Sequence, residues 1–310
     1  MVANIESIFY TRTKPWHSLG KYVAEAPASR EALKLAGLDW DVIQKDVYTG
    51  DGIYVSGFKA NVRDSDNKVL GIVTNRYKVV QNRDAFAFTD TLLGEGVRYE
   101  TAGSLLGGKK IWLLARLPRE YIVTGERISP YLVFSNTHDG SGAVKVAVTP
   151  IRVVCNNTLN LALSTADRSW SMIHTGDINS KIKEAEDTLF MAENYMSELG
   201  KEFEHLRDIK LDQEQIHDYI ELLLPLEEGA SPVTRRNVKK LREDMTSRYY
   251  DAPDLKTMPD NAYRFINAVS DFATHSDPLR KTANYREQIF HRTIEGNPMI
   301  DKAYRLVKAA

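Results

Sequence analysis

A run of basic side chains between residues 232 and 249 could bind phosphate groups. The run holds six basic and two acidic residues. The candidate phosphate ligands within it are Arg235, Arg236, Lys239 and Lys240. Lys and Arg side chains that neutralise nucleic-acid phosphates release counterions, so such a surface gives an affinity that falls as salt rises. A solvated helix face produces the same pattern and is the structural alternative.

A second basic segment runs from residue 107 to residue 152 and contains seven basic and three acidic residues. The candidate ligands in this segment are Lys109, Lys110, Lys145 and Arg152. Basic residues on twisted hairpins, with Trp112 and Tyr131 nearby, are one way to hold a nucleic-acid strand by charge and stacking. A sheet edge protected by lysines is the alternative.

Two further polar residues are candidates for ligand contact. His138 precedes Asp139 and Gly140, and a His-Asp pair supplies the nitrogen and oxygen of a metal or acid–base site. A metal centre needs three or four ligands, however, and no second motif accompanies the pair. We therefore expect a turn set by Asp-Gly, with His138 as a phosphate contact. Asn156 stands at the expected start of a helix, where it caps the helix or helps to bind an anion.

The sequence predicts no metal, no cofactor and no assembled catalytic site. Cys155 is the single cysteine, so no internal disulfide can form, and zinc-finger spacing is absent. A reducing compartment is favoured, and the expected location is the cytoplasm. Residues 1–20 lack the regions of a secretory signal. The apolar runs are far shorter than the roughly 20 residues that span a bilayer, so we expect no membrane partner.

The composition is that of a globular protein without a dominant charge. Of 310 residues, 43% are hydrophobic and 27% are charged, which excludes a wholly disordered or collagen-like chain. Lys and Arg number 41 against 42 Asp and Glu. Any binding to nucleic acid must therefore depend on local patches.

The first half of the chain is predicted to position the second basic segment on strands. It is rich in Val, Ile, Tyr and Thr, with turns that contain Gly, which is typical of hairpins. The predicted hairpins pair residues 97–102 with 110–117 and residues 131–135 with 143–154. Short helices are predicted over 31–38 and 84–93, and another helix from Asn156 onwards.

The second half is predicted to be helical. Apolar residues from Ile178 to Leu206 alternate at spacings of four and three, which predicts one long amphipathic helix over 180–206. We expect helices 212–224 and 261–273 to cover this apolar seam, with self-association as the alternative. Ser231 and Pro232 begin the basic helix, which runs towards Tyr249.

These elements predict an α+β fold. An antiparallel sheet with hairpins forms the N-terminal half, and the C-terminal half is helical with one long amphipathic helix. The corresponding domains are an α+β domain at 1–175 and a helical domain or subdomain at 176–310.

Several strings of the sequence resemble a known family. They are PWHSLG at 15–20, AGLDWDV at 36–42, TNRYKVVQNRDAF at 74–86, TAGSLLGGKKIWLLARLP at 101–118, YLVFSNTHDGSGAVKVAVTPIRVVCNNTL at 131–159, IHTGDI at 173–178 and NAYRFINAVSDFATH at 261–275. With them the chain resembles the phage/plasmid-like domain-of-unknown-function family DUF 932 nearly end to end. The resemblance implies a protein of phages, prophages or plasmids, encoded near genes of DNA replication and recombination. It implies no activity and no catalytic residues.

The favoured function is nucleic-acid binding, in the form of single-stranded DNA binding or annealing during phage or plasmid recombination or replication. The local basic patches support it, and so does the lack of a catalytic constellation. One alternative is a protein-interaction factor, for host takeover or against host defence, whose partner is a host or phage protein. Another is a metal-dependent nuclease that uses His138, Asp139 and distant carboxylates. A homo-oligomer is the alternative in which the apolar seam is covered by self-association.

Overall fold

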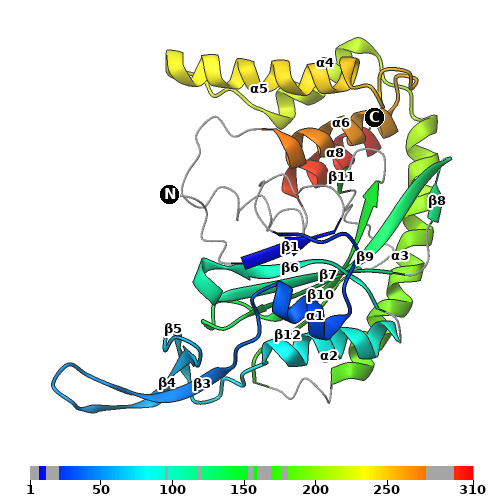
Figure 1. The fold of residues 1–310 in the computed structure, drawn as a ribbon. Helices are drawn as coiled ribbons and strands as arrows, with labels where there is room; N and C mark the ends of the chain where they lie inside the picture. The colour runs from blue at the N-terminus through cyan, green and yellow to red at the C-terminus, as the bar shows by residue number, and fades with distance from the viewer. Residues whose placement is uncertain are drawn as a thin grey trace. The chain divides into compact units, whose positions relative to one another are not determined.

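The computed structural model describes residues 7–11, 21–94, 97–117, 121–123, 125–152, 157–158, 169–175, 181–276 and 297–309 (Figure 1). The chain forms two compact units, and each is assembled from separate stretches of sequence. Unit 1 comprises Met1–Pro118, Tyr131–Val148 and Arg168–Ala192. Unit 2 comprises Arg119–Pro130, Thr149–Asp167 and Glu193–Ala310. The units interleave in sequence, whereas the sequence predicts one boundary at residue 175.

Unit 1 contains a mainly antiparallel sheet. Its strands are β1 (Ser7–Tyr10), β2 (Lys21–Tyr22), β6 (Tyr99–Leu105), β7 (Lys110–Arg116), β9 (Glu126–Thr137), β10 (Val144–Arg152) and β12 (Ser169–Met172). They lie in the order β10-β9-β7-β6-β1-β2, with β12 beside β10. The short strands β1 and β2 pair in parallel. Both predicted hairpins, β6–β7 and β9–β10, are neighbouring strands, which confirms the predicted α+β fold.

Two helices complete the core of this unit. They are α1 (Ser29–Leu35) and α2 (Asn82–Leu93), and a short 3-10 turn η1 (Leu106–Gly108) links β6 to β7. A capping box formed by Gln81 and Asp84 starts α2. Phe86 of α2 packs with Tyr99 and Phe134 of the sheet in one buried cluster, so hydrophobic burial holds the helices on the strands.

A separate three-stranded antiparallel sheet also belongs to unit 1. Its strands are β3 (Val42–Tyr48), β4 (Tyr54–Arg63) and β5 (Val69–Thr74), with β4 in the centre. In Figure 1 the β3–β4 hairpin extends away from the main sheet. Its end therefore lies away from the unit's core.

Unit 2 is built from helices. They are α4 (Gln213–Leu223), α5 (Pro232–Asp251), α6 (Ala262–His275), α8 (Pro298–Lys308) and the part of α3 (Ile182–Asp208) from Glu193 onwards. Two short strands, β8 (Tyr121–Val123) and β11 (Asn157–Thr158), pair with the ends of β9 and β10. The predicted capping box of Asp212 and Gln215 is present at α4. None of the described helices is long and apolar enough to cross a membrane.

The long helix α3 confirms the predicted amphipathic helix. Met196, Leu199, Phe203 and Leu206 of its apolar seam are buried in one cluster with residues of α4, α6 and α8. Internal packing therefore covers this part of the seam, as predicted. The structure does not describe the burial of the seam positions that precede Met196.

The helix that was predicted from Asn156 onwards is wrong at its start. Asn157 and Thr158 pair with Arg152 and Ile151 of β10 and extend the sheet instead. Asn156 itself, Cys155 and residues 159–168 lie outside the described residues.

Candidate functional site

The first half of α5 is a helix segment without a buried side chain. Ser231 caps the helix by accepting the Thr234 N–H at 3.1 Å, and Pro232 occupies the first turn. The only buried residues of α5 are Met245 and Tyr249, both in its second half. The second half therefore provides the buried side chains of α5, and the side chains of the first half are exposed or only partly buried.

The four cations predicted on this helix lie together in its exposed half. Arg235, Arg236, Lys239 and Lys240 are all exposed. At about 100° per residue they fall within an arc of about 140° and a length of about 7.5 Å. The Lys239 side chain is 77% exposed and lies 3.9 Å from Glu243, while Arg235 donates from Nε to the Ala230 carbonyl at 3.0 Å. We call these four residues the α5 basic surface.

The other two basic residues of α5 serve the fold. Arg242 pairs with Glu221 of α4 and donates to the Leu224 carbonyl at 3.0 Å. Arg248 bonds Asp244 at 3.0 Å and Asp271 of α6 at 2.5 Å. These contacts fix α5 against its two neighbouring helices.

The carboxyl of Asp271, which pairs with Arg248 of α5, is held in its charged form. Burial alone would raise the pKa of its carboxyl. Hydrogen bonds from His275 and Arg248 outweigh that effect and hold the pKa below its ordinary value. The carboxylate therefore stays charged at neutral pH.

A groove of about 680 Å³ lies between α4 and α5. Arg235 and Lys239 line it from α5, and His217 and Glu221 line it from α4. The α4 helix carries three acidic residues and no Lys or Arg. Because Glu243 and Asp251 of α5 also line the groove, phosphate is favoured at the start of α5, around the helix from Arg235 towards Arg236 and Lys240.

The second predicted basic segment offers less exposed charge. Lys110 is only 7% exposed, and Lys109 and Lys145 are half-buried. The backbone of Arg152 pairs with Asn157, and its side chain lies outside the description, as does all of Asn156. Lys109, Lys110 and Lys145 belong to unit 1, whereas the α5 basic surface belongs to unit 2.

His138 is fully buried and does not reach a surface ligand. Its Nε2 lies 2.9 Å from Oδ1 of Asn82. The Asn82 amide nitrogen donates to the Leu38 carbonyl, so Oδ1 accepts and His138 Nε2 carries the proton. Burial and the nearby His174 lower the pKa of His138 to about 3, so the ring is neutral. We therefore leave His138 out of the proposed phosphate surface.

His138 instead belongs to a buried polar cluster beside the β9–β10 turn. Its backbone carbonyl accepts the Asn61 amide at 2.7 Å, and Trp40 packs edge-on against its ring at 5.4 Å. His174 stacks on Tyr77 at 4.4 Å and bonds the Lys78 carbonyl through Nδ1 at 3.0 Å. These contacts join β4 and the segment after β5 to the turn.

Sequence reasoning missed this cluster because its members are scattered between residues 40 and 174. The only available signal was a set of polar residues beside apolar runs. Within the described residues, no three His, Cys, Asp or Glu side chains form a group that could hold a metal ion. The cluster's contacts account for a structural role at the turn.

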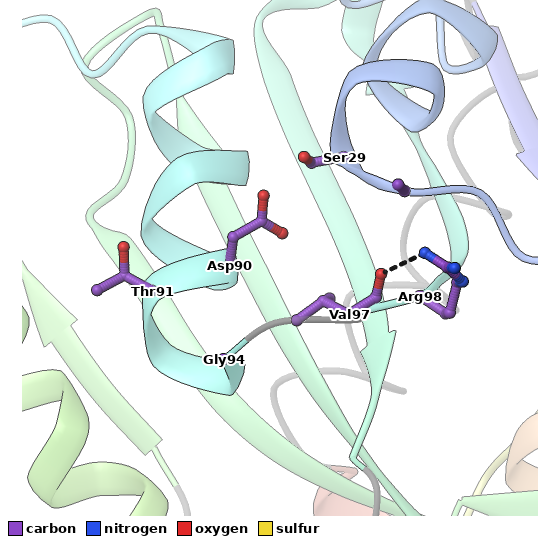
Figure 2. A pocket seen from close by; sticks show the side chains of 7 residues that line it. Ser29, Asp90, Thr91, Gly94, Val97 and Arg98 are labelled. Carbon is purple, nitrogen blue, oxygen red and sulfur yellow. Dashed lines mark hydrogen bonds between the residues drawn. The ribbon is translucent and has the colours of Figure 1, made fainter.

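A second hollow, of about 490 Å³, lies in unit 1 beside the end of α2 (Figure 2). Ser29, Asp90, Thr91 and Arg98 are among the residues that line it. Asp90 already accepts the Tyr99 hydroxyl at 2.7 Å, and Arg98 donates to a neighbouring carbonyl at 3.4 Å. The hollow thus offers one exposed cation, fewer than the α5 basic surface.

Comparison with known families identifies the chain. A family model described as a domain of unknown function, DUF932, matches residues 69–293. The chain belongs to the DUF932 family. The match confirms the resemblance to DUF932 over residues 69–293, a region that includes α5, His138 and His174. No curated protein and no solved structure matches the chain.

Proposed function

We propose that the protein binds nucleic acid, with single-stranded DNA as the preferred ligand, through phosphates on the α5 basic surface. The observation that carries the proposal is the gathering of four exposed cations on a helix segment without a buried side chain. Val238 and Leu241 of this segment are partly buried, and the four cations lie on another side of the helix from the buried Met245 and Tyr249, so their charges do not serve the core.

The spacing of these cations supports the same proposal. Arg235 and Lys239 are four residues apart, and so are Arg236 and Lys240. Like charges at this spacing on a helix repel and destabilise it by about 0.2–0.5 kcal/mol per pair. A bound polyanion removes this repulsion, and counterion release adds to the affinity.

The proposal extends to the biological setting. The protein acts in single-strand binding or annealing during recombination or replication of a phage or plasmid, in the cytoplasm of the bacterial host. The family resemblance supports this setting by association. Non-specific phosphate binding suits such a role, because an annealing protein must accept many sequences.

A pair of matched variants tests the proposal. Lys239→Gln with Lys240→Gln removes two cations from the surface, and Lys210→Gln with Lys256→Gln removes two exposed lysines elsewhere in unit 2. With labelled single-stranded DNA, the first variant should bind more weakly, with a salt slope smaller by about 1.4, or 0.7 per lost contact. Equal loss in both variants contradicts the assignment to α5.

A further inference from the structure

Three buried side chains of unit 1 each keep one hydrogen-bond acceptor without a partner. The acceptor atoms are Oδ1 of Asn136, Nδ1 of His138 and Nε2 of His174. Asn136 and His138 are fully buried, and His174 is only 5% exposed. A buried acceptor without a donor costs free energy, so each such atom in a folded protein needs an explanation. A bound ligand is one explanation that would serve all three.

The existing hydrogen bonds determine that each of these atoms holds a free electron pair. His138 carries its ring proton on Nε2, so its Nδ1 is unprotonated. His174 donates from Nδ1 to the Lys78 carbonyl at 3.0 Å, so its Nε2 is unprotonated. Asn136 donates from its amide nitrogen to the Val80 carbonyl at 3.0 Å, which leaves Oδ1 free.

The three side chains approach the same short segment of the chain. Their hydrogen-bond partners in that segment are Lys78, Val80 and Asn82. The two histidines are also linked through a third ring. His174 stacks on Tyr77, whose hydroxyl donates to the carbonyl of Thr137, the residue before His138. His174 lowers the pKa of His138 as well, which places the two rings within electrostatic reach of each other.

The described side-chain donors around these atoms are already used. The Tyr77 hydroxyl donates to the Thr137 carbonyl, and the Asn82 amide donates to the Leu38 carbonyl. The Asn61 amide donates to a backbone carbonyl as well. A single water molecule has two hydrogens to donate, one fewer than the number of free acceptors. A metal cation, by contrast, accepts electron pairs from all three atoms.

The chemistry of the three atoms selects the class of cation. Imidazole nitrogen suits zinc, copper, nickel and iron, whereas magnesium and calcium take oxygen ligands. Asp139 lies near enough to His138 to favour positive charge there, which also suits a cation. The set differs from the His138–Asp139 pair of the sequence analysis, because its second nitrogen comes from His174, beyond β12. An amide oxygen is the third member, in place of another histidine or a carboxylate.

We propose that His138, His174 and Asn136 hold one divalent transition-metal ion of the zinc class. Nδ1 of His138 and Nε2 of His174 are its nitrogen ligands, and Oδ1 of Asn136 is its oxygen ligand. The ion joins the end of β9 to the segment after β12 and stabilises unit 1. The α5 basic surface belongs to unit 2, so this inference goes beyond the proposed function and does not depend on it.

Zinc binding to the full chain without a His tag tests the site. At about pH 7.5, where histidine is mostly unprotonated, metal-free protein should bind one zinc ion per chain. Its melting temperature should rise with free zinc, because the ion binds the folded state. Magnesium should have neither effect.

Matched variants locate the ion. His174→Phe keeps a ring to stack on Tyr77 and removes the ligand nitrogen. Since loss of a residue that only supports a ligand costs about 10- to 100-fold in metal affinity, loss of this ligand should cost at least about 100-fold. His217→Gln, at an exposed histidine of α4, is the control and should bind zinc like the wild type. Thermal melts without metal show whether each variant is folded.

Two results would overturn the proposal. A wild type that binds no zinc, nickel or copper refutes the site and leaves its acceptors to water. Equal zinc binding by the wild type and His174→Phe, with loss in His217→Gln, assigns the ion to the surface instead. If His174→Phe does not fold, electron paramagnetic resonance of copper(II) on the wild type decides. Two coordinated imidazole nitrogens support the site, and fewer contradict it.

Discussion

Acidification should destabilise the protein through His138. Burial lowers the pKa of this histidine to about 3 in the folded state, against 6.5 as its ordinary value. The unfolded chain therefore binds a proton below about pH 6.5 that the folded chain rejects, and stability falls as pH drops. At about pH 5 the difference of 1.5 pH units, at 1.36 kcal/mol each, amounts to about 2 kcal/mol relative to neutral pH.

Urea unfolding at about pH 7 and about pH 5 measures this loss. His138→Gln keeps an amide N–H in the place of Nε2 and cannot titrate. Between the two pH values its free energy of unfolding should therefore fall by about 2 kcal/mol less than that of the wild type. His217→Gln, at an exposed histidine of α4, is the control and should follow the wild type. If the wild type and His138→Gln lose the same stability, the buried neutral histidine is refuted.

Three further substitutions test the packing. Gly71→Ala drives a Cβ into the backbone of Asp139 and should cost about 1–3 kcal/mol in urea unfolding, whereas Gly50→Ala, with open space around it, should not. Leu199→Asp buries a charge in the α3 seam and should cost about 3 kcal/mol or more, and an unchanged thermal melt would show that the seam is not buried. Ser231→Ala removes the α5 cap and should cost about 1 kcal/mol by the same melt, so no loss there would rule out the cap.

The helical half of the fold followed closely from sequence because its signals are local. Asp212 with Gln215 and Ser231 with Pro232 mark helix starts through caps that need no distant partner. The heptad spacing before Leu206 likewise determines which face of α3 is buried. Exposure of the α5 cations also agreed with their spacing, because they fall on a different side of the helix from the apolar positions that include Met245 and Tyr249.

Strands β3 and β4 received no prediction from the sequence. Gly57 has a φ of 86°, and the pairing of β3 with β4 shifts register between Asp46 and Tyr48, so the alternation of polar and apolar residues is broken. Burial of His138 depends on β4 and on Asn82, which are distant in sequence. Such contacts leave no local pattern, so the turn was predicted correctly and its environment was not.

Salt dependence of single-stranded DNA binding tests the central claim most directly. Four phosphate contacts on α5 predict a slope of log affinity against log salt of about −2.8, which is roughly a 50-fold loss between about 50 mM and about 200 mM salt. Replacing Arg235, Arg236, Lys239 and Lys240 together by Gln should remove that slope component. No binding by the wild type at about 50 mM salt, or an unchanged slope in the fourfold variant, would contradict phosphate binding by the α5 basic surface.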